Sequence, residues 1–554
     1  MNNILQILKD NPGVKALINE EEGLASLTMI EEALLLATYF KETKKNVIVV
    51  KNNAYNAQRL FEYIRNIEDD NKILLFNVEE SLRIEAIAAS PETMADKIET
   101  LSKLVQGDQY MLITNTAGLL KHLPNYDHFA NSVIQLKVDQ EITIDELSRK
   151  LISSGYQMTA RVDQPLTFAR RGGIIDVFSI NYDSPIRIEF FDTMIDSLRN
   201  FDISTQRTIA LINEVNIIPA TDILFTPDQI TEITQNVEIQ LEKERSNINN
   251  DDHLVLAENI NKDLDYIKNH IKDNYLYRYY AYLTKTSSIV DYLQDPLIIM
   301  SSLEEIQTNN RNLVEENVIY MQELYSERKA LLKFKLFNDV NEILAARSVY
   351  QVHQFPSLKN QINSKILTLS VPEQPLDITL KIISKEVEDH RVILCLNEKE
   401  LKNIIDPLIT MNIPYQIIDS ESHIPQGLSL CLYPLVEGFE ISDQKVIVYS
   451  GKELFKNKTK IGRYANKFKE AEVLSSYLDL NKGDYIVHNL YGIGKYMGII
   501  TKQIEHHHKD FLNIVYRGDD ILLVPLEQFQ LVRKFVSREG VKPKLNKLGT
   551  SEWA

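Results

Sequence analysis

The segment closest to a catalytic motif is Gly492–Lys495 (Gly-Ile-Gly-Lys), which resembles the end of a nucleotide-binding loop. A Walker A loop has the form Gly-x4-Gly-Lys-Ser/Thr, because backbone N–H groups surround the phosphates and the final hydroxyl binds magnesium. Here Asn489 stands where the first glycine is needed, and Tyr496 follows the lysine. No other segment of the sequence fits the pattern. We therefore expect no phosphate-binding loop, and interpret Gly492–Lys495 as a tight turn between two strands of a small β domain.

Few other side chains have the spacing that catalysis or metal binding requires. The histidines at 506–508 are adjacent and so point in different directions on a strand, unlike an i, i+4 pair on a helix that can chelate one ion. The two cysteines, Cys395 and Cys431, lie in apolar runs and are expected to be reduced core residues of a cytosolic protein. We identify no Ser-His-Asp set, zinc-type spacing or carboxylate pair. The sequence therefore nominates no catalytic, cofactor-binding or metal-binding residue.

The composition limits the class of protein. Of 554 residues, 44% are hydrophobic and 25% are charged, which is typical of a soluble globular protein, and the length predicts several domains. The formal net charge of −17 disfavours strong non-specific binding of DNA by the chain as a whole. No apolar run approaches the ~20 residues that span a membrane, and the first residues lack a signal-peptide layout. We expect a cytoplasmic, monomeric protein with no membrane partner.

Alternating patterns of apolar residues predict a multidomain α/β architecture. Residues 14–19 and 46–52 are predicted to be buried strands on either side of a helix. From residue 131 short strand patterns dominate, and in residues 186–191 the apolar side chains alternate as in a half-buried strand. The predicted parts, in chain order, are a first α/β domain (1–125 and 211–350), an inserted α+β domain (126–210), a small α/β domain (355–455), a linker (456–481), a β barrel (482–535) and a connecting segment (536–554).

Two parts of the sequence resemble known modules. Residues 168–209, which contain Arg-Arg-Gly-Gly-Ile-Ile-Asp-Val-Phe, closely resemble the UvrA-binding module shared by the excision-repair protein UvrB and the bacterial transcription-repair coupling factors. Residues 483–500 and 509–532 resemble the RNA polymerase-interacting domain of the coupling factors, with its Gly-Ile-Gly-Lys-Tyr signature. UvrB lacks the polymerase module, and both modules occur here in the order typical of the coupling factors. That family is therefore the better match.

The resemblance implies a fold and a function. The fold would be a UvrB-like, degenerate P-loop-type α/β domain with an inserted α+β UvrA-binding domain, followed by a small α/β domain and an SH3/Tudor-like β barrel. Residues 18–35 stand where UvrB has its Walker A loop, but they lack Gly-Lys-Ser/Thr. The function would be transcription-coupled DNA repair, in which the factor binds the β subunit of RNA polymerase stalled at a lesion and recruits UvrA for nucleotide excision repair.

In the coupling factors an ATP-driven translocase motor follows the polymerase module, makes the main contact with DNA, and uses ATP and magnesium. By the resemblance this motor would begin beyond Trp553, so we expect the chain to be the N-terminal half of such a factor, with no cofactor of its own. Whether the chain has enzymatic activity stays open. Two alternative functions also stay open: a UvrB-like DNA-processing ATPase, which the missing Walker loop disfavours, and a transcription regulator that binds polymerase through the barrel alone.

The resemblance also nominates residues for UvrA binding. Arg171 aligns with the arginine of the family's Arg-Gly-Gly motif, which the resemblance places at the UvrA contact, and guanidinium groups suit bidentate recognition of carboxylates. Arg170 and Arg161 are candidates for further contacts. Phe178 is expected to be a core residue, with UvrA contact as the less favoured role. Without the resemblance, a solvated surface charge is the simpler interpretation of each arginine.

For RNA polymerase, an exposed strand edge can bind a partner by adding a strand, with affinity from the backbone and specificity from a few side chains. The strand that follows the Gly492–Lys495 turn is the candidate, with Ile499, Ile500, Lys502 and Ile504 nearest the contact. The coupling factors usually have leucine where this chain has Lys502, which puts the apolar anchor in doubt or shifts it to Ile500 or Ile504. The simpler interpretation is that some of these isoleucines fill the barrel.

Overall fold

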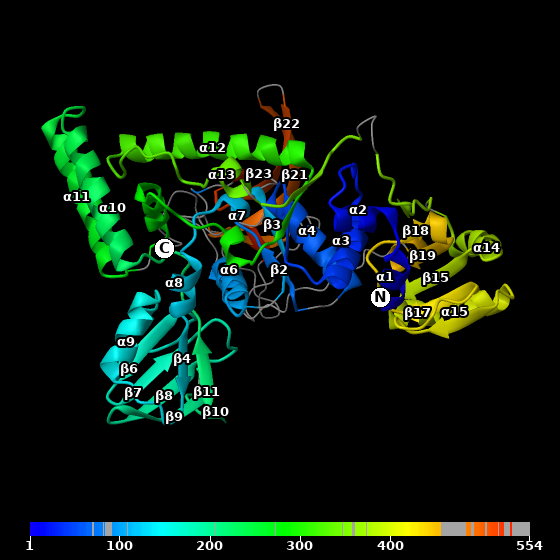
Figure 1. Cartoon of the computed structure of the whole chain (residues 1–554), viewed down its shortest axis with the longest axis horizontal. Helices are drawn as coiled ribbons and strands as arrows, with labels where there is room; N and C mark the ends of the chain where they lie inside the picture. The colour runs from blue at the N-terminus through cyan, green and yellow to red at the C-terminus, as the bar shows by residue number, and fades with distance from the viewer. Residues whose placement is uncertain are drawn as a thin grey trace. The chain divides into compact units, whose positions relative to one another are not determined.

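The computed structural model describes residues 1–68, 71–80, 82, 91–107, 109–203, 205–271, 273–345, 347–356, 361–372, 374–455, 483–488, 492–504, 507–518, 520–525 and 532–534. The chain divides into two compact units, Met1–Gly462 and Arg463–Ala554. Among the described residues, the first unit holds one five-stranded, two six-stranded and one two-stranded sheet, and the second unit holds a five-stranded sheet (Figure 1). The multidomain α/β class predicted from the sequence is therefore confirmed.

A parallel five-stranded sheet forms the centre of the first domain (Figure 1). Its strands, in spatial order, are β13 (Val349–Val352), β12 (Leu297–Ser301), β1 (Val47–Lys51), β3 (Met111–Asn115) and β2 (Ile73–Phe76). Strand β1 confirms the strand predicted at 46–52. Its residues Ile48 and Val50 face one hydrophobic core, and Val47 and Val49 face another. Both faces of the sheet are therefore covered, as is typical of parallel strands that read as continuous apolar runs.

Helices supply the covering layers of this sheet. The core that receives Val47 and Val49 also contains side chains of α1 (Asn2–Leu8), α2 (Pro12–Asn19), α3 (Met29–Thr43) and α4 (Ala54–Ile67). The opposite core contains side chains of α6 (Pro91–Leu104), α7 (Thr116–Leu120), α8 (Tyr126–Asn131), α10 (Pro227–Glu244), α11 (Asn250–Lys268), η1 (Asn274–Tyr282), η2 (Ile289–Tyr292), α12 (Leu303–Ser326) and α13 (Val340–Leu344). Segments far apart in the sequence thus complete one domain.

Residues 14–19 belong to helix α2, so the strand predicted there is wrong. Pro12 is the first residue of the helix, and the Asn11 side chain accepts a hydrogen bond from the Gly13 N–H at 2.8 Å. The helix ends at Glu20, whose φ of 55° is left-handed. A short apolar run does not distinguish a strand from a buried helix, and here the Asn-Pro cap favours the helix.

The inserted domain is built on a six-stranded sheet with a helix on one face (Figure 1). Its strands, in spatial order, are β10 (Thr208–Ile212), β9 (Met194–Phe201), β8 (Ile186–Phe191), β7 (Ile174–Val177), β6 (Thr167–Arg171) and β5 (Gln157–Met158). Neighbours are antiparallel except β5 and β6. The helix is α9 (Ile144–Ser153). Strand β11 (Glu214–Ile217) pairs with β4 (Ile134–Lys137), so strand pairing continues past residue 210, where we predicted the end of this domain.

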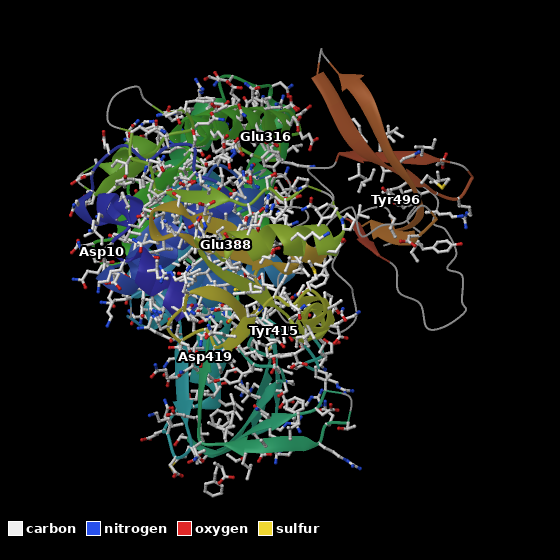
Figure 2. All side chains as sticks on the ribbon, turned by 90° about the vertical axis from the view of Figure 1, so that its right-hand side faces the viewer. Asp10, Glu316, Glu388, Tyr415, Asp419 and Tyr496 are labelled. Atoms are coloured by element: carbon white, nitrogen blue, oxygen red, sulfur yellow. The ribbon has the colours of Figure 1, made fainter. Side chains whose placement is uncertain are left out.

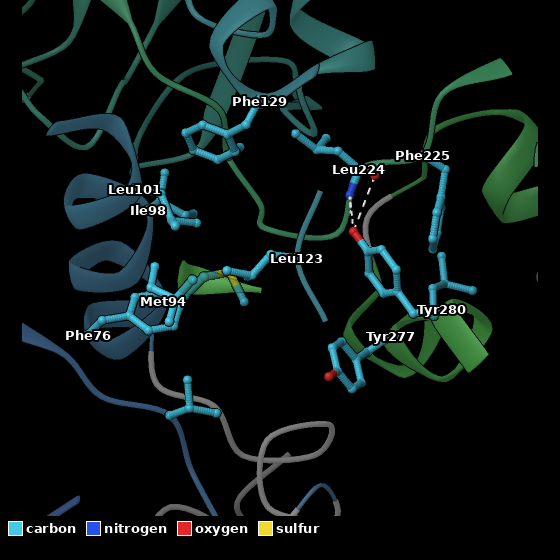
Figure 3. Packing of buried hydrophobic residues seen from close by; sticks show 14 of the residues in the cluster. Phe76, Met94, Ile98, Leu101, Leu123, Phe129, Leu224, Phe225, Tyr277 and Tyr280 are labelled. Atoms are coloured by element: carbon cyan, nitrogen blue, oxygen red, sulfur yellow. Dashed lines mark hydrogen bonds between the residues drawn. The ribbon is translucent and has the colours of Figure 1, made fainter. Parts of the chain in front are cut away.

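The core that contains side chains of α6 to α13 is rich in aromatic residues. Figure 3 shows Tyr277 and Tyr280 of η1 within it. The Tyr280 hydroxyl accepts a hydrogen bond from the Leu224 N–H at 3.3 Å and donates one to the Leu224 carbonyl at 3.2 Å, the dashed lines of Figure 3. Leu224 lies on the segment that returns from the inserted domain. These buried bonds therefore tie the inserted domain to the first domain.

A second six-stranded sheet forms the small α/β domain. Its strands, in spatial order, are β14 (Ile366–Thr368), β18 (Phe439–Ile441), β19 (Val446–Ser450), β15 (Arg391–Leu396), β17 (Gly427–Leu432) and β16 (Tyr415–Ile418). Helices α14 (Leu376–Glu386), α15 (Glu398–Thr410) and α16 (Gly451–Phe455) share a core with one face, and the other face shares the core of α1 to α4. Cys395 and Cys431 lie opposite each other in that shared core as free, buried thiols, as predicted.

The unit Arg463–Ala554 contains an antiparallel sheet. Its strands, in spatial order, are β23 (Ile521–Pro525), β22 (His507–Val515), β21 (Gly492–Ile504), β20 (Tyr485–His488) and β24 (Val532–Lys534). Tyr496 of β21, labelled in Figure 2, is buried, and its N–H donates to the Asp484 carbonyl. The predicted linker (456–481) and connecting segment (536–554) lie outside the described residues.

Gly492–Lys495, predicted as a turn, are instead the first residues of β21 and pair with β20. Residues 489–491, between these two strands, lie outside the described residues. At Gly494 a Cβ atom would lie 2.5 Å from the side chain of Ile514. Glycine is therefore required there because β22 packs closely against it, and not because the backbone turns.

His122 is a buried titratable group in the aromatic core, with 1% of its surface exposed. Its Nε2 lies 3.1 Å from the carbonyl oxygen of Lys335. Burial lowers the pKa of His122 to about 4, because a charged imidazolium would lose its hydration there. The folded protein therefore keeps this side chain neutral at pH values where the unfolded chain, with a pKa of 6.5, becomes protonated.

We predict that the free energy of unfolding falls as the pH drops from 6.5 to about 4, and that His122→Asn removes part of this fall. In this window the unfolded chain binds a proton that the folded chain does not bind, so acid favours unfolding, by up to about 3 kcal/mol for a shift of this size. Urea unfolding at several pH values measures the slope of the free energy of unfolding against pH. The exposed His423→Asn is the control and should keep the wild-type slope; a wild-type slope in His122→Asn would contradict the prediction.

Candidate interaction surfaces

The two faces of the sheet in the inserted domain differ in character. Arg170, Ile175, Ile188 and Leu198 lie in register across β6 to β9, and the three apolar side chains are buried. Arg170, at the end of this row, forms an ion pair with Asp145 of α9. This row therefore faces α9 and the core. Because side chains alternate along each strand, the adjacent rows face the opposite way.

We call that opposite side the outer face. Its central row, in register, is Ala169, Asp176, Arg187, Arg199 and Leu211. Arg187 binds Asp176 through two hydrogen bonds of 2.7 and 2.8 Å. These bonds raise the pKa of the Arg187 guanidinium, which stays charged, and they hold its plane in one orientation. The sequence analysis did not nominate this row, although the alternation in residues 186–191 was a signal for it.

Two of the arginines nominated for UvrA binding lie close together beside the outer face. Arg171 is exposed, and its guanidinium donates to the Ala160 carbonyl from Nη2 at 2.7 Å and from Nε at 3.2 Å. Arg161 is also exposed, and its Nη2 donates to the Ile203 carbonyl at 2.7 Å. Each guanidinium keeps further N–H groups that these bonds do not use. A partner carboxylate can therefore bind to arginines that are already oriented.

Phe178 follows β7 directly and is 8% exposed. It belongs to a small hydrophobic cluster with Val162, Ala169 and the half-buried Ile203. The core role predicted for Phe178 fits this position. Arg170 is separated from the group because it points to α9, so the structure brings three of the four nominated residues together and leaves Arg170 on the other face.

Gly172 and Gly173 form the two-residue turn that joins β6 to β7, since Arg171 pairs with Ile174 across the turn. Gly172 has a φ of +57°, and a Cβ atom added there would have no atom within 4 Å. The turn therefore needs glycine for its backbone conformation and not for space. It places Arg171 at the end of β6.

In the second unit, β21 is paired on its two sides over different lengths. It pairs with β22 as far as Ile504, but with β20 only as far as Lys495. Beyond Gly498, the edge on the β20 side has no strand neighbour in the described part of the chain. The backbone of Ile499, Ile500, Lys502 and Ile504 lies along this part of β21, and Ile500 is half-buried. The side chains of Ile499, Lys502 and Ile504 are outside the described residues.

The carboxyl edge of the first sheet is the place where parallel α/β folds usually bind ligands. Here the Lys51 ammonium, at the end of β1, lies 2.7 Å from Glu32 Oε2 and 2.7 Å from Ser301 Oγ. Lys51 is 7% and Glu32 is 3% exposed. Glu31 accepts a hydrogen bond from the Thr28 N–H and so caps the N-terminus of α3, the helix that also carries Glu32. Carboxylates of the chain itself thus lie at the N-terminus of α3, where the helix dipole favours negative charge.

Within the described residues, no group of three or more His, Cys, Asp or Glu side chains is arranged to hold a metal ion. None of the described helices combines the length and the apolar character needed to cross a membrane. Chemical function is therefore sought at the surfaces just described, where charged side chains and strand edges are accessible.

Comparisons with known proteins match both surfaces. Residues 134–223 match the family model of the UvrB interaction domain, and residues 480–536 match that of the CarD-like/TRCF RID domain. The transcription-repair-coupling factor of Bacillus subtilis (strain 168) is 30% identical over 573 residues, which cover 100% of this chain and 49% of the relative. That of Staphylococcus aureus (strain bovine RF122 / ET3-1) is 30% identical over 543 residues, which cover 96% of this chain and 46% of the relative. The chain spans about half the length of the curated relatives it matches, and the resemblance found in the sequence is confirmed.

We predict that Lys51→Met lowers the free energy of unfolding by about 3–5 kcal/mol, because it leaves Glu32 as an unpaired buried charge. Replacing both partners, in Glu32→Met/Lys51→Met, should recover most of the loss, because two apolar side chains need no charge partner. Denaturant unfolding measures the free energy of unfolding of the wild type, the single variant and the double variant. Lys9→Met, which breaks an exposed pair with Glu42, is the control and should change stability little. Equal effects of Lys51→Met and Lys9→Met would contradict the prediction.

Proposed function

We propose, from the premise that this chain is homologous to about half the length of the transcription-repair-coupling factors, that it links RNA polymerase to nucleotide excision repair. One observation carries the proposal. The two segments that match interaction domains lie in different compact units, and each has a candidate binding element: exposed arginines beside the outer face in one, and in the other a stretch of β21 that lacks a strand neighbour on one side within the described residues. The two partners would therefore bind separate parts of the chain.

The partner of the inserted domain is UvrA. Arg171 and Arg161 bind carboxylates of UvrA, and Phe178 supports them as a member of the cluster with Ile203. Fork-shaped guanidinium groups that are already held by carbonyl oxygens lose little conformational freedom on binding. Arg170 lies on the other face, and we assign it a peripheral contact around the turn at Gly172.

The partner of the second unit is the β subunit of RNA polymerase. We propose that the five-stranded sheet closes into an SH3/Tudor-like barrel, and that a polymerase strand adds to the open edge of β21 at Ile499 and Ile500. Backbone groups along such an edge supply the affinity, while Lys502 and Ile504 adjust the specificity. The shorter pairing of β21 with β20 supports this placement.

We further propose that the chain acts as a monomeric, cytoplasmic adaptor that binds no ATP or magnesium at the first sheet. The Lys51–Glu32 pair supports this, because it sets charged side chains of the chain itself, already paired with each other, at the carboxyl end of β1. The same pair disfavours the alternative of a UvrB-like DNA-processing ATPase. The division into a first domain with its insertion, a small α/β domain and a C-terminal barrel is part of the same proposal.

We predict that Arg171→Ala weakens binding of UvrA by about tenfold or more, because a charge-assisted contact is lost. Biolayer interferometry with the full chain and purified UvrA measures the dissociation constant. Arg311→Ala on α12 is the matched control, since Arg311 is an exposed arginine outside the inserted domain. Equal affinities of Arg171→Ala and Arg311→Ala would exclude Arg171 from the contact, and no binding by the wild-type chain would refute the proposed function.

We predict that Lys502→Leu tightens binding of RNA polymerase by about tenfold, because a buried leucine contributes roughly 1.5–3 kcal/mol that a lysine does not. A pull-down titration of polymerase with the full chain measures the change. Lys495→Leu is the control, because Lys495 lies on the part of β21 that β20 covers. Should Lys502→Leu bind no better than Lys495→Leu, the open edge of β21 would not be the polymerase site.

A further inference from the structure

The outer face carries exposed apolar side chains as well as arginines. Phe191 and Met194 pair across the hairpin between β8 and β9, and are 74% and 44% exposed. Leu211 on β10 is 75% exposed and lies opposite Arg199. Leu211 lies apart from the Phe191–Met194 pair, because its partner Arg199 is separated from Met194 along β9. We call these three residues, Phe191, Met194 and Leu211, the apolar corner.

Register places the apolar corner on the outer face. Phe190 pairs with Ile195, which is fully buried, so the next pair, Phe191 and Met194, points the other way. Leu211 continues the row that contains Arg199 and Arg187, whereas its neighbour Ile212 pairs with the buried Leu198. The three side chains of the corner thus share the face that carries the charged row.

Two rows of the outer face connect the apolar corner to the arginines nominated for UvrA binding. Phe191 and Met194 lie beyond the row of Arg171, Ile174, Glu189 and Ser197, and the charged row contains Leu211. From Leu211 the charged row runs through Arg199, Arg187 and Asp176 to Ala169, and Ala169 packs against Phe178. In the middle of the row, Arg187 binds Asp176 and Arg199 binds Glu189, while Arg199 Nε is buried without a hydrogen-bond partner in the described structure. The exposed groups lie outside the middle: the cationic Arg161 and Arg171, and the apolar Leu211, Phe191 and Met194.

Strand β10 is also an unprotected edge. It ends the six-stranded sheet, and its outer side pairs with no strand in the described part of the chain. Residues 208–212 (Thr-Ile-Ala-Leu-Ile) contain no charged residue, whereas free edge strands usually carry charges that prevent association. An exposed leucine on such an edge, together with exposed apolar side chains on the same face of the two neighbouring strands, indicates a surface that a partner covers.

We propose that the apolar corner is a second subsite of the UvrA contact, at which UvrA buries apolar side chains against Phe191, Met194 and Leu211. This inference rests on the proposed function, and it fixes the chemistry of the partner: carboxylates opposite Arg161 and Arg171, and an apolar patch opposite the corner. Continuity of the outer face between the two ends argues for one partner that covers both. Aromatic and aliphatic anchors beside arginines are the composition of energetically dominant interface centres.

The test compares Phe191→Ser and Leu211→Ser with Phe355→Ser and Ile417→Ser in the full chain. The control residues are 71% and 68% exposed and lie outside the inserted domain, and Ile417 also lies on an edge strand, β16. Because all four side chains are exposed, thermal unfolding should stay at the wild-type temperature in every variant. Binding of UvrA is measured by biolayer interferometry at low and at high salt.

Each corner variant should bind UvrA about tenfold or more weakly than its control, by the same factor at both salt concentrations, since apolar burial is not screened. Arg171→Ala should lose affinity mainly at low salt. If the corner variants bind like their controls while Arg171→Ala is impaired, the subsite is wrong and the proposed function stands. If the corner variants are impaired and Arg171→Ala is not, the subsite stands and Arg171 is excluded. Absence of UvrA binding by the wild-type chain refutes both.

Discussion

The alternation of side chains between the two faces of a strand is the constraint on which the outer face depends. Once Ile188 and Leu198 are buried toward α9, their strand neighbours Arg187 and Arg199 must point the other way. The hydrogen bonds between Arg187 and Asp176 then keep this side of the sheet ordered. The exposed groups at its ends are thus presented on a rigid support, which lowers the entropic cost of binding a partner.

The first domain serves as a scaffold in this arrangement. Its sheet is parallel, and at the carboxyl end of β1 Lys51 forms an ion pair with Glu32 of α3. The pair is nearly fully buried. Removal of one of its side chains therefore lowers the free energy of unfolding by more than the intact pair adds to it. The helices on one side of the sheet share a core with the small α/β domain, and the bonds between Tyr280 and Leu224 hold the returning segment of the inserted domain.

Local sequence patterns predicted much of the fold. They failed where a contact between residues distant in the sequence determines the local structure. The apolar run of β1, the capped helix α3 and the alternation in β8 were predicted correctly because each pattern is complete within a few residues. Residues 14–19 were assigned to a strand because their apolar character suits both structures. Gly492–Lys495 were assigned to a turn because glycine often marks one, whereas the packing of Ile514 against Gly494 is what requires it.

The sequence by itself determined the chemical types: the absence of a Walker pattern, the Arg-Gly-Gly motif that begins at Arg171, and the two interaction modules in their order. Only the tertiary structure decided which of these side chains meet. Strand register brought Leu211 into one row with Arg187 and turned Arg170 away to α9. The fold also set Arg171 against the Ala160 carbonyl and Arg161 against the Ile203 carbonyl. The physical reason is that register and face are fixed by the burial of apolar rows from several strands together, and no single strand contains that information.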